Sequence, residues 1–427
     1  MSSRPVPEYL LPDTHAVDET GKSQIGGVDL VTLADQFGTP LFVYDEVHLE
    51  NRCKEAVEAW GKGNVAYATK AFLCKEMARL ATNSGMNLDV STFGELYLAL
   101  KAGAHGSSIV LHGNNKSSEE LSLAIENSVS KIVVDSFHEL DRLEALARGR
   151  PGPIRVMVRV TPGVEAHTHE YVQTGQDNSK FGFGLSGGYA KTALEKISRS
   201  PRLDLVGIHV HIGSQIFSTN SFALALSTIA DFVRDLDIEE VCVGGGLGVG
   251  YVEGEFAPTI AQWADTIHQA AVEAEINPRV RLSAEPGRSI VAKAGVTLYR
   301  VGTIKDVSET KTFLSVDGGM SDNPRPVLYG SGYEAFLPRS FRAARDKVLD
   351  IVGKHCESGD FIIKGANLPG DVVVGDVLAT PVSGAYGYSM ASNYNKVPRP
   401  AVVFVKAGEV KEVVRRETHD DLIRLDL

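Results

Sequence analysis

In the stretch NVAYATKAF, residues 64–72, a short and mostly apolar run is followed by a lysine, Lys70. Apolar and small side chains alternate up to Lys70, which is the pattern of a half-buried or buried strand. A lysine at such a place is costly unless its charge is paired, neutralised or used covalently. The simpler alternative is a strand-end lysine whose amine reaches solvent. This stretch leaves both alternatives open.

A glycine run offers a possible anion site. VCVGGGLGVGY, residues 241–251, places Gly244, Gly245 and Gly246 directly after an apolar strand. The backbone N–H groups of such a loop, with a helix N-terminus nearby, can bind a phosphate group. A tight glycine turn is the alternative, so the position of this loop in the fold has to decide.

A carboxylate follows another apolar strand in SAEPGRS, residues 283–289. Glu285 either pairs with Arg288 at a strand end or holds a protonated ring nitrogen, the partner that an electron-sink cofactor requires.

Two histidines of GIHVHIGSQ, His209 and His211, share one face of a strand. Such a pair can bind zinc, and His167 and His169 form a second His-x-His pair. A catalytic zinc site would need carboxylate or thiolate companions at short spacing, and the sequence has none. We therefore predict no metal, and expect a strand-end histidine that stacks on a flat ring, with Ser214 helping to bind phosphate.

A cysteine lies in the polar stretch GKHCESGD, residues 353–360. A cysteine is most often a small buried apolar residue. The flanking His355 and Glu357 indicate instead a polar pocket in which the Cys356 thiol could exchange protons.

Eight short apolar strands alternate with helical stretches, which predicts a (β/α)8 barrel. The expected strands are residues 64–69, 86–91, 107–113, 131–136, 154–161, 205–213, 239–246 and 280–287. An open doubly wound sheet is the alternative, but eight units with no reversal favour closure. Active sites of barrels lie at the C-terminal ends of the strands. Polar or glycine residues end nearly every strand here: Lys70, Asp89, His112, Asn114, Asp135, Arg159, Thr161, His211, Ser214, Gly244–Gly246 and Glu285.

The sequence pattern changes after about residue 296, where it predicts β-strands separated by glycine and proline turns, with few helices. The strand in TPLFVYDEV, residues 39–47, precedes the barrel and is expected to join these later strands. We therefore expect residues 1–45 to belong to a β domain, residues 46–295 to form the barrel, and residues 296–427 to form a mainly-β domain resembling a sandwich or small barrel.

Composition limits the function classes. The chain of 427 residues is 43% hydrophobic with a net charge of −11, which fits a globular protein of two domains and argues against nucleic acid as a partner. No apolar run is long enough for a bilayer, and the N-terminus lacks a signal-peptide pattern. Four scattered cysteines without a Cys-x-x-Cys pair favour reduced thiols and a cytoplasmic location.

The lysine at a barrel rim, the phosphate-binding loop after the seventh strand, the carboxylate and the stacking histidine together describe a site for pyridoxal 5′-phosphate. Lys70 is then the Schiff-base lysine and is used covalently. With these features the chain resembles the fold-type III pyridoxal phosphate decarboxylases from about Pro40 to Ala407, and within them the branch that acts on diaminopimelate. The motifs are YATKAF, HGNNKS, TPGVEAHTHEY, HVHIGSQ, GGGLGVGY, AEPGR, SVDGGMSDNPRPVLYG, GKHCESGD and GAYGYSMASNYN.

The resemblance implies decarboxylation of meso-2,6-diaminopimelate to L-lysine and CO2, the last step of lysine biosynthesis, by a homodimer with shared active sites. It implies catalytic roles for Lys70, His211 and for Cys356 as the proton donor. The implied cofactor-binding residues are Lys70, Asp89, His211, Ser214, Gly244, Gly245, Gly246, Glu285, Gly287, Arg288 and Tyr386. The implied substrate-binding residues are Arg288, Arg325, Tyr329, Glu357 and Tyr386, with Cys356 and Glu357 supplied to the neighbouring subunit. Phe72 departs from the pattern, since many relatives carry asparagine there.

Other activities remain open on the same scaffold. Ornithine, arginine or carboxynorspermidine decarboxylases share it, but Arg288 and Arg325 suit a distal carboxylate that a distal amine does not provide. A non-catalytic regulatory relative would typically lose Lys70 or Cys356, and both are present. An enzyme similar to alanine racemase would lack the HCESGD and SDNPRP motifs.

Overall fold

The computed structural model describes residues 4–163 and 179–427, which form two compact units. The barrel unit comprises residues 52–248 and 257–289, and the β unit comprises residues 1–51, 249–256 and 290–427. His167 and His169 lie outside the described residues.

The predicted barrel is confirmed. Parallel strands follow one another in chain order around the sheet, and β10 (Phe183–Gly184) adds a short strand beside β9. The eight barrel strands are β5 (Ala66–Ala68), β6 (Asn87–Val90), β7 (Ile109–Leu111), β8 (Lys131–Val134), β9 (Ile154–Thr161), β11 (Leu203–Val210), β12 (Glu240–Cys242) and β13 (Arg281–Ser283).

The first and last strands close the ring. Val65 forms a parallel bridge with Ala284, and the N–H group of Ala66 donates to the Ala284 carbonyl at 2.9 Å. The N–H group of Ala68 continues this seam to the Pro286 carbonyl at 3.1 Å. An open sheet is therefore excluded, and the C-terminal ends of β5 and β13 are neighbours.

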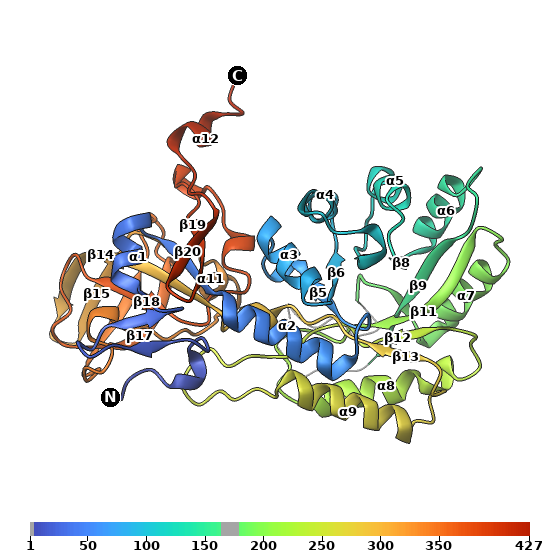
Figure 1. The fold of residues 1–427 in the computed structure, drawn as a ribbon, viewed down its shortest axis with the longest axis horizontal. Coiled ribbons are helices and arrows are strands. Elements are labelled where there is room, and N and C mark those ends of the chain that lie inside the picture. The colour runs from blue at the N-terminus through green and yellow to red at the C-terminus, as the bar shows by residue number, and fades with distance from the viewer. Residues whose placement is uncertain (1–3, 164–178) are drawn as a thin grey trace. The chain divides into compact units, whose positions relative to one another are not determined.

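Helices cover the outside of the barrel strands (Figure 1), as the alternating sequence pattern requires. Buried side chains from five neighbouring strands form one apolar cluster: Val110, Val133, Met157, Val206 and Cys242. The helices are α2 (Glu46–Trp60), α3 (Lys75–Asn83), α4 (Phe93–Ala102), α5 (Ser118–Glu126), α6 (Phe137–Leu146), α7 (Tyr189–Ser198), α8 (Thr219–Val233) and α9 (Ile260–Glu273). A short helix, α10 (Arg288–Val291), follows the last barrel strand.

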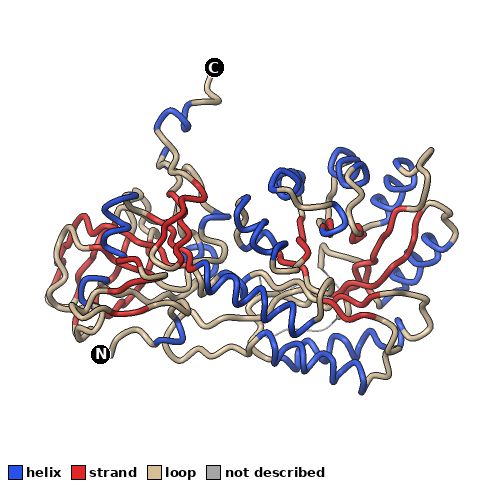
Figure 2. Tube along the Cα trace, viewed as in Figure 1, coloured by secondary structure: helices blue, strands red, loops and turns tan. Residues whose placement is uncertain are grey.

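The β unit is built mainly from strands and loops (Figure 2). Its main sheet has the order β17-β16-β15-β14-β4-β19-β20, with β18 paired to β14. The N-terminal strand β4 lies between β14 and β19, which confirms that the segment before the barrel joins the later strands. The strands are β4 (Leu41–Asp45), β14 (Gly295–Ser308), β15 (Lys311–Val316), β16 (Lys347–Val352), β17 (Phe361–Leu368), β18 (Val377–Thr380), β19 (Ala401–Lys406) and β20 (Glu409–Val414).

Smaller elements complete the β unit. A separate small sheet precedes α1, and two short helices lie later in the chain: β1 (Ala16–Val17), β2 (Ser23–Ile25), β3 (Val28–Asp29), α1 (Leu30–Phe37), α11 (Arg325–Tyr329) and α12 (His419–Ile423). Among the residues described, no helix combines the length and apolar character that crossing a bilayer would require.

Candidate active site

Lys70 lies in a short 3-10 turn directly after β5 rather than inside the strand. The predicted strand is shortened because Thr69 already belongs to this turn. Thr69 Oγ1 donates to the Asp89 carbonyl at 2.8 Å, and Tyr67 Oη donates to the carbonyl of the buried Phe72 at 2.6 Å. The turn is fixed on both sides, whereas the Lys70 side chain is exposed. Its amine is thus presented at the C-terminal end of the first barrel strand.

The glycine run follows β12 and leaves no room for side chains. A Cβ atom on Gly245 would lie 2.3 Å from the Glu285 carbonyl oxygen, and one on Gly246 would lie 2.3 Å from the Gly213 carbonyl oxygen. Gly244 and Gly246 also have φ angles of 70° and 116°, which residues that carry a side chain rarely adopt. Close backbone approach therefore explains the glycines, and the loop offers a surface of backbone only, as an anion site needs.

His211 borders the glycine loop. The N–H group of Gly245 donates to His211 Nδ1 at 3.2 Å, so the neutral ring carries its proton on Nε2. Burial holds the pKa of His211 well below its ordinary 6.5, and the positive charges of Lys70 and Arg159 lower this pKa further. The imidazole is therefore neutral at physiological pH, and it can stack on a flat ligand.

Arg288 and Ser214 meet beside the same loop. Arg288 is 8% exposed, and its Nη2 atom donates to Ser214 Oγ at 2.8 Å. The structure thus brings together two residues that the sequence places at the ends of different strands.

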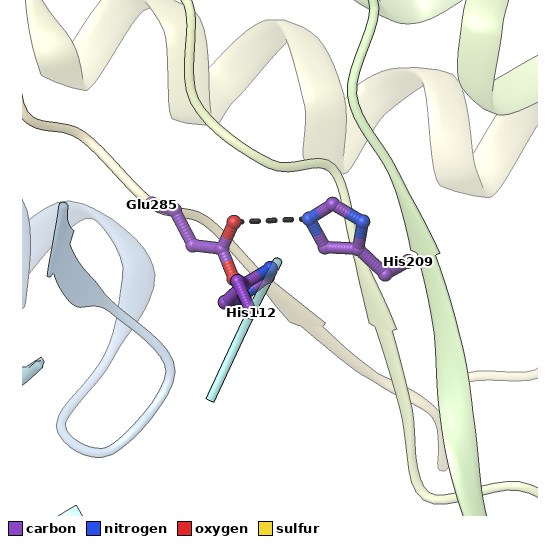
Figure 3. Close-up of side chains that lie close together, drawn as sticks. All are labelled: His112, His209 and Glu285. Atoms are coloured by element: carbon purple, nitrogen blue, oxygen red, sulfur yellow. Dashed lines mark hydrogen bonds and ion pairs between the residues drawn. The ribbon is translucent and has the colours of Figure 1, made fainter. Parts of the chain in front are cut away.

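The carboxylate of Glu285 lies between two histidines (Figure 3). His112 Nε2 lies 2.8 Å from Oε1, and His209 Nε2 lies 3.0 Å from Oε2. An ionised carboxylate only accepts hydrogen bonds, so both Nε2 atoms carry a hydrogen. Each carboxylate oxygen has two lone pairs. Glu285 therefore keeps the capacity to accept a further bond from a ligand.

The charges of this cluster depend on one another. Burial by itself would raise the pKa of Glu285, but His112 and His209 hold it well below the ordinary 4.5. Burial lowers the pKa of His209 to about 4. Burial also acts to lower the pKa of His112, but Asp89 and Glu285 outweigh it and raise this pKa above 6.5. At neutral pH, Glu285 is thus an anion and His209 is neutral, an arrangement that favours a protonated ligand nitrogen.

The same three residues could hold a cation, because their ligand atoms lie within 4.8 Å of one another. Two histidines and one glutamate are a known zinc ligand set. A zinc-bound histidine normally donates a hydrogen bond from its other nitrogen. Nδ1 of His209 is buried and has no hydrogen-bond partner among the described residues. The geometry therefore favours an oriented carboxylate over a metal centre.

Arg325 is the most informative predicted site residue of the β unit. It begins α11 and is 5% exposed. Nη1 donates to Tyr251 Oη at 2.6 Å and Nη2 donates to Ser331 Oγ at 3.0 Å. The guanidinium also lies 4.6 Å from the Tyr251 ring and 5.9 Å from the Tyr386 ring. Burial acts to lower the pKa of the Arg325 guanidinium, and the neighbouring groups that raise this pKa are tyrosines.

No described carboxylate forms an ion pair with Arg325, and its Nε atom has no hydrogen-bond partner in the described part of the chain. A buried cation without an anionic partner is costly. Arg325 is therefore suited to bind the carboxylate of a small molecule.

Cys356 and Glu357 lie on the hairpin loop between β16 and β17, and both are exposed. Of the four cysteines, Cys53, Cys74 and Cys242 are buried. Tyr394 Oη donates to the Glu357 carboxylate. Tyr329 ends α11 and, like Tyr386, is half-buried.

Sequence reasoning did not assign a role to His112 or His209 at Glu285. His112 appeared only as a strand-end residue, and His209 only as half of a possible zinc pair. The sole signal was that His209 precedes His211 by two residues and so shares its face of the strand.

The barrel unit belongs to a known class. The family model described as "Pyridoxal-dependent decarboxylase, pyridoxal binding domain" matches residues 46–292 and so spans the whole unit. The class is thus that of the pyridoxal-dependent decarboxylases.

Similar proteins narrow this class. Diaminopimelate decarboxylase of Bacillus subtilis (strain 168) is 45% identical over an alignment that covers 98% of each chain. The enzyme of that name from Mycobacterium tuberculosis (strain H37Rv) is 45% identical over 96% of each chain. The crystal structure of diaminopimelate decarboxylase from M. jannaschii in complex with L-lysine has 34% identity and a TM-score of 0.89, and covers 97% of this chain and 98% of that one. The chain therefore belongs to the diaminopimelate decarboxylase family.

The residues of the barrel unit fit pyridoxal phosphate. The loop of Gly244–Gly246 has no room for a Cβ atom at Gly245 or Gly246, so its backbone is open to a phosphate group. The buried, ionised carboxylate of Glu285 is available to a ring nitrogen, and the exposed amine of Lys70 follows the first strand. Gly287 adds to this fit because its Cβ would lie 3.0 Å from Ala68, next to the Lys70 turn.

Proposed function

We propose that this protein decarboxylates meso-2,6-diaminopimelate to L-lysine and CO2, the last step of lysine biosynthesis, with pyridoxal 5′-phosphate as its cofactor. The observation that carries this proposal is the likeness to diaminopimelate decarboxylases along 98% of both chains.

The barrel unit supplies the residues that would hold the cofactor. Lys70 would bind the aldehyde through its amine, and His211 would stack on the ring. Glu285, kept ionised by its two histidines, would accept a hydrogen bond from the ring nitrogen. When bound, pyridoxal phosphate accepts the electron pair of the breaking bond to the carboxylate. The remaining contacts are proposed for Tyr386 of the β unit and for these residues of the barrel unit: Asp89, Ser214, Gly244, Gly245, Gly246, Gly287 and Arg288.

The β unit supplies substrate recognition. Arg325 lacks a carboxylate partner among the described residues and would form a charge-assisted bond with the distal carboxylate of the substrate. Glu357, which already accepts from Tyr394, would hold the distal ammonium group. Tyr329 and Tyr386 of the β unit and Arg288 of the barrel unit complete the proposed contacts.

Cys356 would return a proton to the carbon that has lost CO2. Its exposure on a hairpin loop, unlike the other three cysteines, supports this role. We further propose a cytoplasmic homodimer in which Cys356 and Glu357 serve the neighbouring subunit's barrel.

A product assay tests the function. Purified protein with pyridoxal phosphate and meso-diaminopimelate should form L-lysine, detected by mass spectrometry. Ornithine and arginine in parallel reactions should release no CO2. Release from either at a comparable rate would instead identify a related basic amino-acid decarboxylase, and no release from any substrate would indicate a non-catalytic relative. Borohydride reduction followed by peptide mapping should label Lys70.

A further inference from the structure

The loop that carries Cys356 has an exposed stretch, residues 356–359, between two buried residues, His355 and Asp360. Cys356 and Glu357 are exposed, whereas His355 is 7% exposed and Asp360 is 3% exposed. The loop thus has two internal attachment points, and the exposed thiol lies directly beside the first of them.

The His355 ring joins three separate segments of the β unit. Its Nε2 atom lies 2.8 Å from Ser321 Oγ, and its Nδ1 atom lies 2.9 Å from Asn395 Oδ1. The neutral ring with its proton on Nδ1 satisfies both bonds, since the amide oxygen accepts and the hydroxyl donates. The ring also packs 5.3 Å from that of Tyr394, which binds Glu357.

Asp360 fixes the other end of the loop through backbone groups. Its Oδ2 atom accepts from the His355 N–H group at 2.9 Å, and its Oδ1 atom accepts from the Met320 N–H group at 2.7 Å. A Cβ atom on Gly319 would lie 2.6 Å from this carboxylate, and one on Gly353 would lie 2.1 Å from it. The carboxylate is therefore enclosed by backbone and cannot shift without moving the loop.

We propose that His355 is a positioning residue that holds the Cys356 loop in its reactive conformation by bonding Ser321 and Asn395. This inference rests on the proposed function, in which Cys356 delivers the proton. His355 is adjacent to Cys356, and its hydrogen bonds to Ser321 and Asn395, called here the His355 clamp, restrict where the thiol can lie. This matters because a small displacement of a reacting group lowers the rate by a large factor.

A double-mutant cycle on the holoenzyme tests the inference. His355→Ala should lower kcat by about 10- to 100-fold with little change in cofactor occupancy, and His355→Asn, which restores a donor near Asn395, should recover part of this loss. His355→Ala added to Cys356→Ala should cost nothing further, because the loop then has no thiol to position. A double variant slowed by the full factor of His355→Ala would overturn the proposal. The exposed His419→Ala is the matched control and should keep wild-type kcat.

Hydrogen exchange separates this inference from the proposed function. In His355→Ala, peptides covering residues 353–360 should exchange faster by about tenfold or more, while peptides of the barrel unit should be unchanged. Unchanged exchange in the loop would overturn the inference, whatever Cys356 does. Wild-type kcat in Cys356→Ala would refute the proton-donor role, and exchange would still decide whether His355 anchors the loop. If His355→Ala fails to fold, Ser321→Ala removes one bond of the clamp and should give the same two effects in weaker form.

Discussion

Replacing Asp89 by asparagine should stabilise the barrel unit at neutral pH and have a much smaller effect in acid. Asp89 lies in β6 and is 8% exposed, and its Oδ1 atom lies 3.7 Å from His112 Nε2. Burial raises the pKa of its carboxyl group from an ordinary 3.8 to about 6, even though the charge of His112 acts to lower it. The ionised side chain is therefore unfavourable for folding.

The magnitude follows from proton linkage. Between pH 3.8 and about 6 the folded state binds more protons at Asp89 than the unfolded state does. The stability contributed by this residue therefore falls as the pH rises through that window. Each pKa unit corresponds to about 1.4 kcal/mol, so ionised Asp89 destabilises the fold by about 3 kcal/mol above the window. Asparagine is neutral at every pH and avoids this penalty.

Tryptophan fluorescence can isolate the barrel unit. Both tryptophans of the chain, Trp60 and Trp263, lie in it, and their rings are 5.0 Å apart. Urea unfolding of the cofactor-free protein should show a higher free energy of unfolding for Asp89→Asn than for wild type. The difference should be about 1 kcal/mol at about pH 4.5 and about 3 kcal/mol at about pH 7.5. Comparing variant with wild type at each pH cancels the titrating groups that do not interact with Asp89, whereas His112, whose pKa Asp89 raises, is part of the measured effect.

Asp235→Asn, at an exposed position of the same unit, is the control and should show no such growth with pH. If the advantage of Asp89→Asn stays constant between the two pH values, or becomes a loss at the higher one, the reasoning about buried charge is wrong.

Three further substitutions test the site. Cys356→Ala should lower kcat by about 10²- to 10⁴-fold, the usual contribution of a placed general acid, with cofactor absorbance unchanged; wild-type turnover would contradict the assignment. Arg325→Ala should raise KM for diaminopimelate by about tenfold or more, since a charge-assisted bond contributes about 1.5–3 kcal/mol; an unaltered KM would exclude a role in substrate binding. Gly245→Ala should weaken binding of pyridoxal phosphate, measured by fluorescence titration, because its Cβ would lie 2.3 Å from a carbonyl oxygen. Gly152→Ala, where a Cβ meets nothing within 4 Å, should bind normally.

The barrel could be predicted because its signal is local. Each strand is a short apolar run with a polar or glycine residue at its end, and this pattern survives without tertiary information. Strand ends were less predictable: residues 64–69 read as one strand, but the hydrogen bond from Thr69 to Asp89 turns the chain before Lys70. That bond joins neighbouring strands and has no counterpart in a linear pattern.

The carboxylate cluster shows where sequence reasoning stops. Glu285 could be predicted as a site residue from its place after the eighth strand. Its partners could not be predicted, because His112 follows β7 and His209 lies in β11, both far from Glu285 along the chain, and only the closed ring brings them to its carboxylate. The His355 clamp is similar, since Ser321 and Asn395 are remote in sequence and neither carries a motif of its own.

The chain passes between its two units four times, after residues 51, 248, 256 and 289. As a consequence, neither unit is a continuous piece of polypeptide, and no single cut separates them. Leu41 of β4 pairs with Ala401 of β19, so this inner strand of the β unit gains one of its neighbours only after the barrel segments have been synthesised. Such long-range pairing slows folding. The nascent N-terminal strand thus stays open to wrong partners while the ribosome makes the barrel, and synthesis should benefit from a chaperone that shields it.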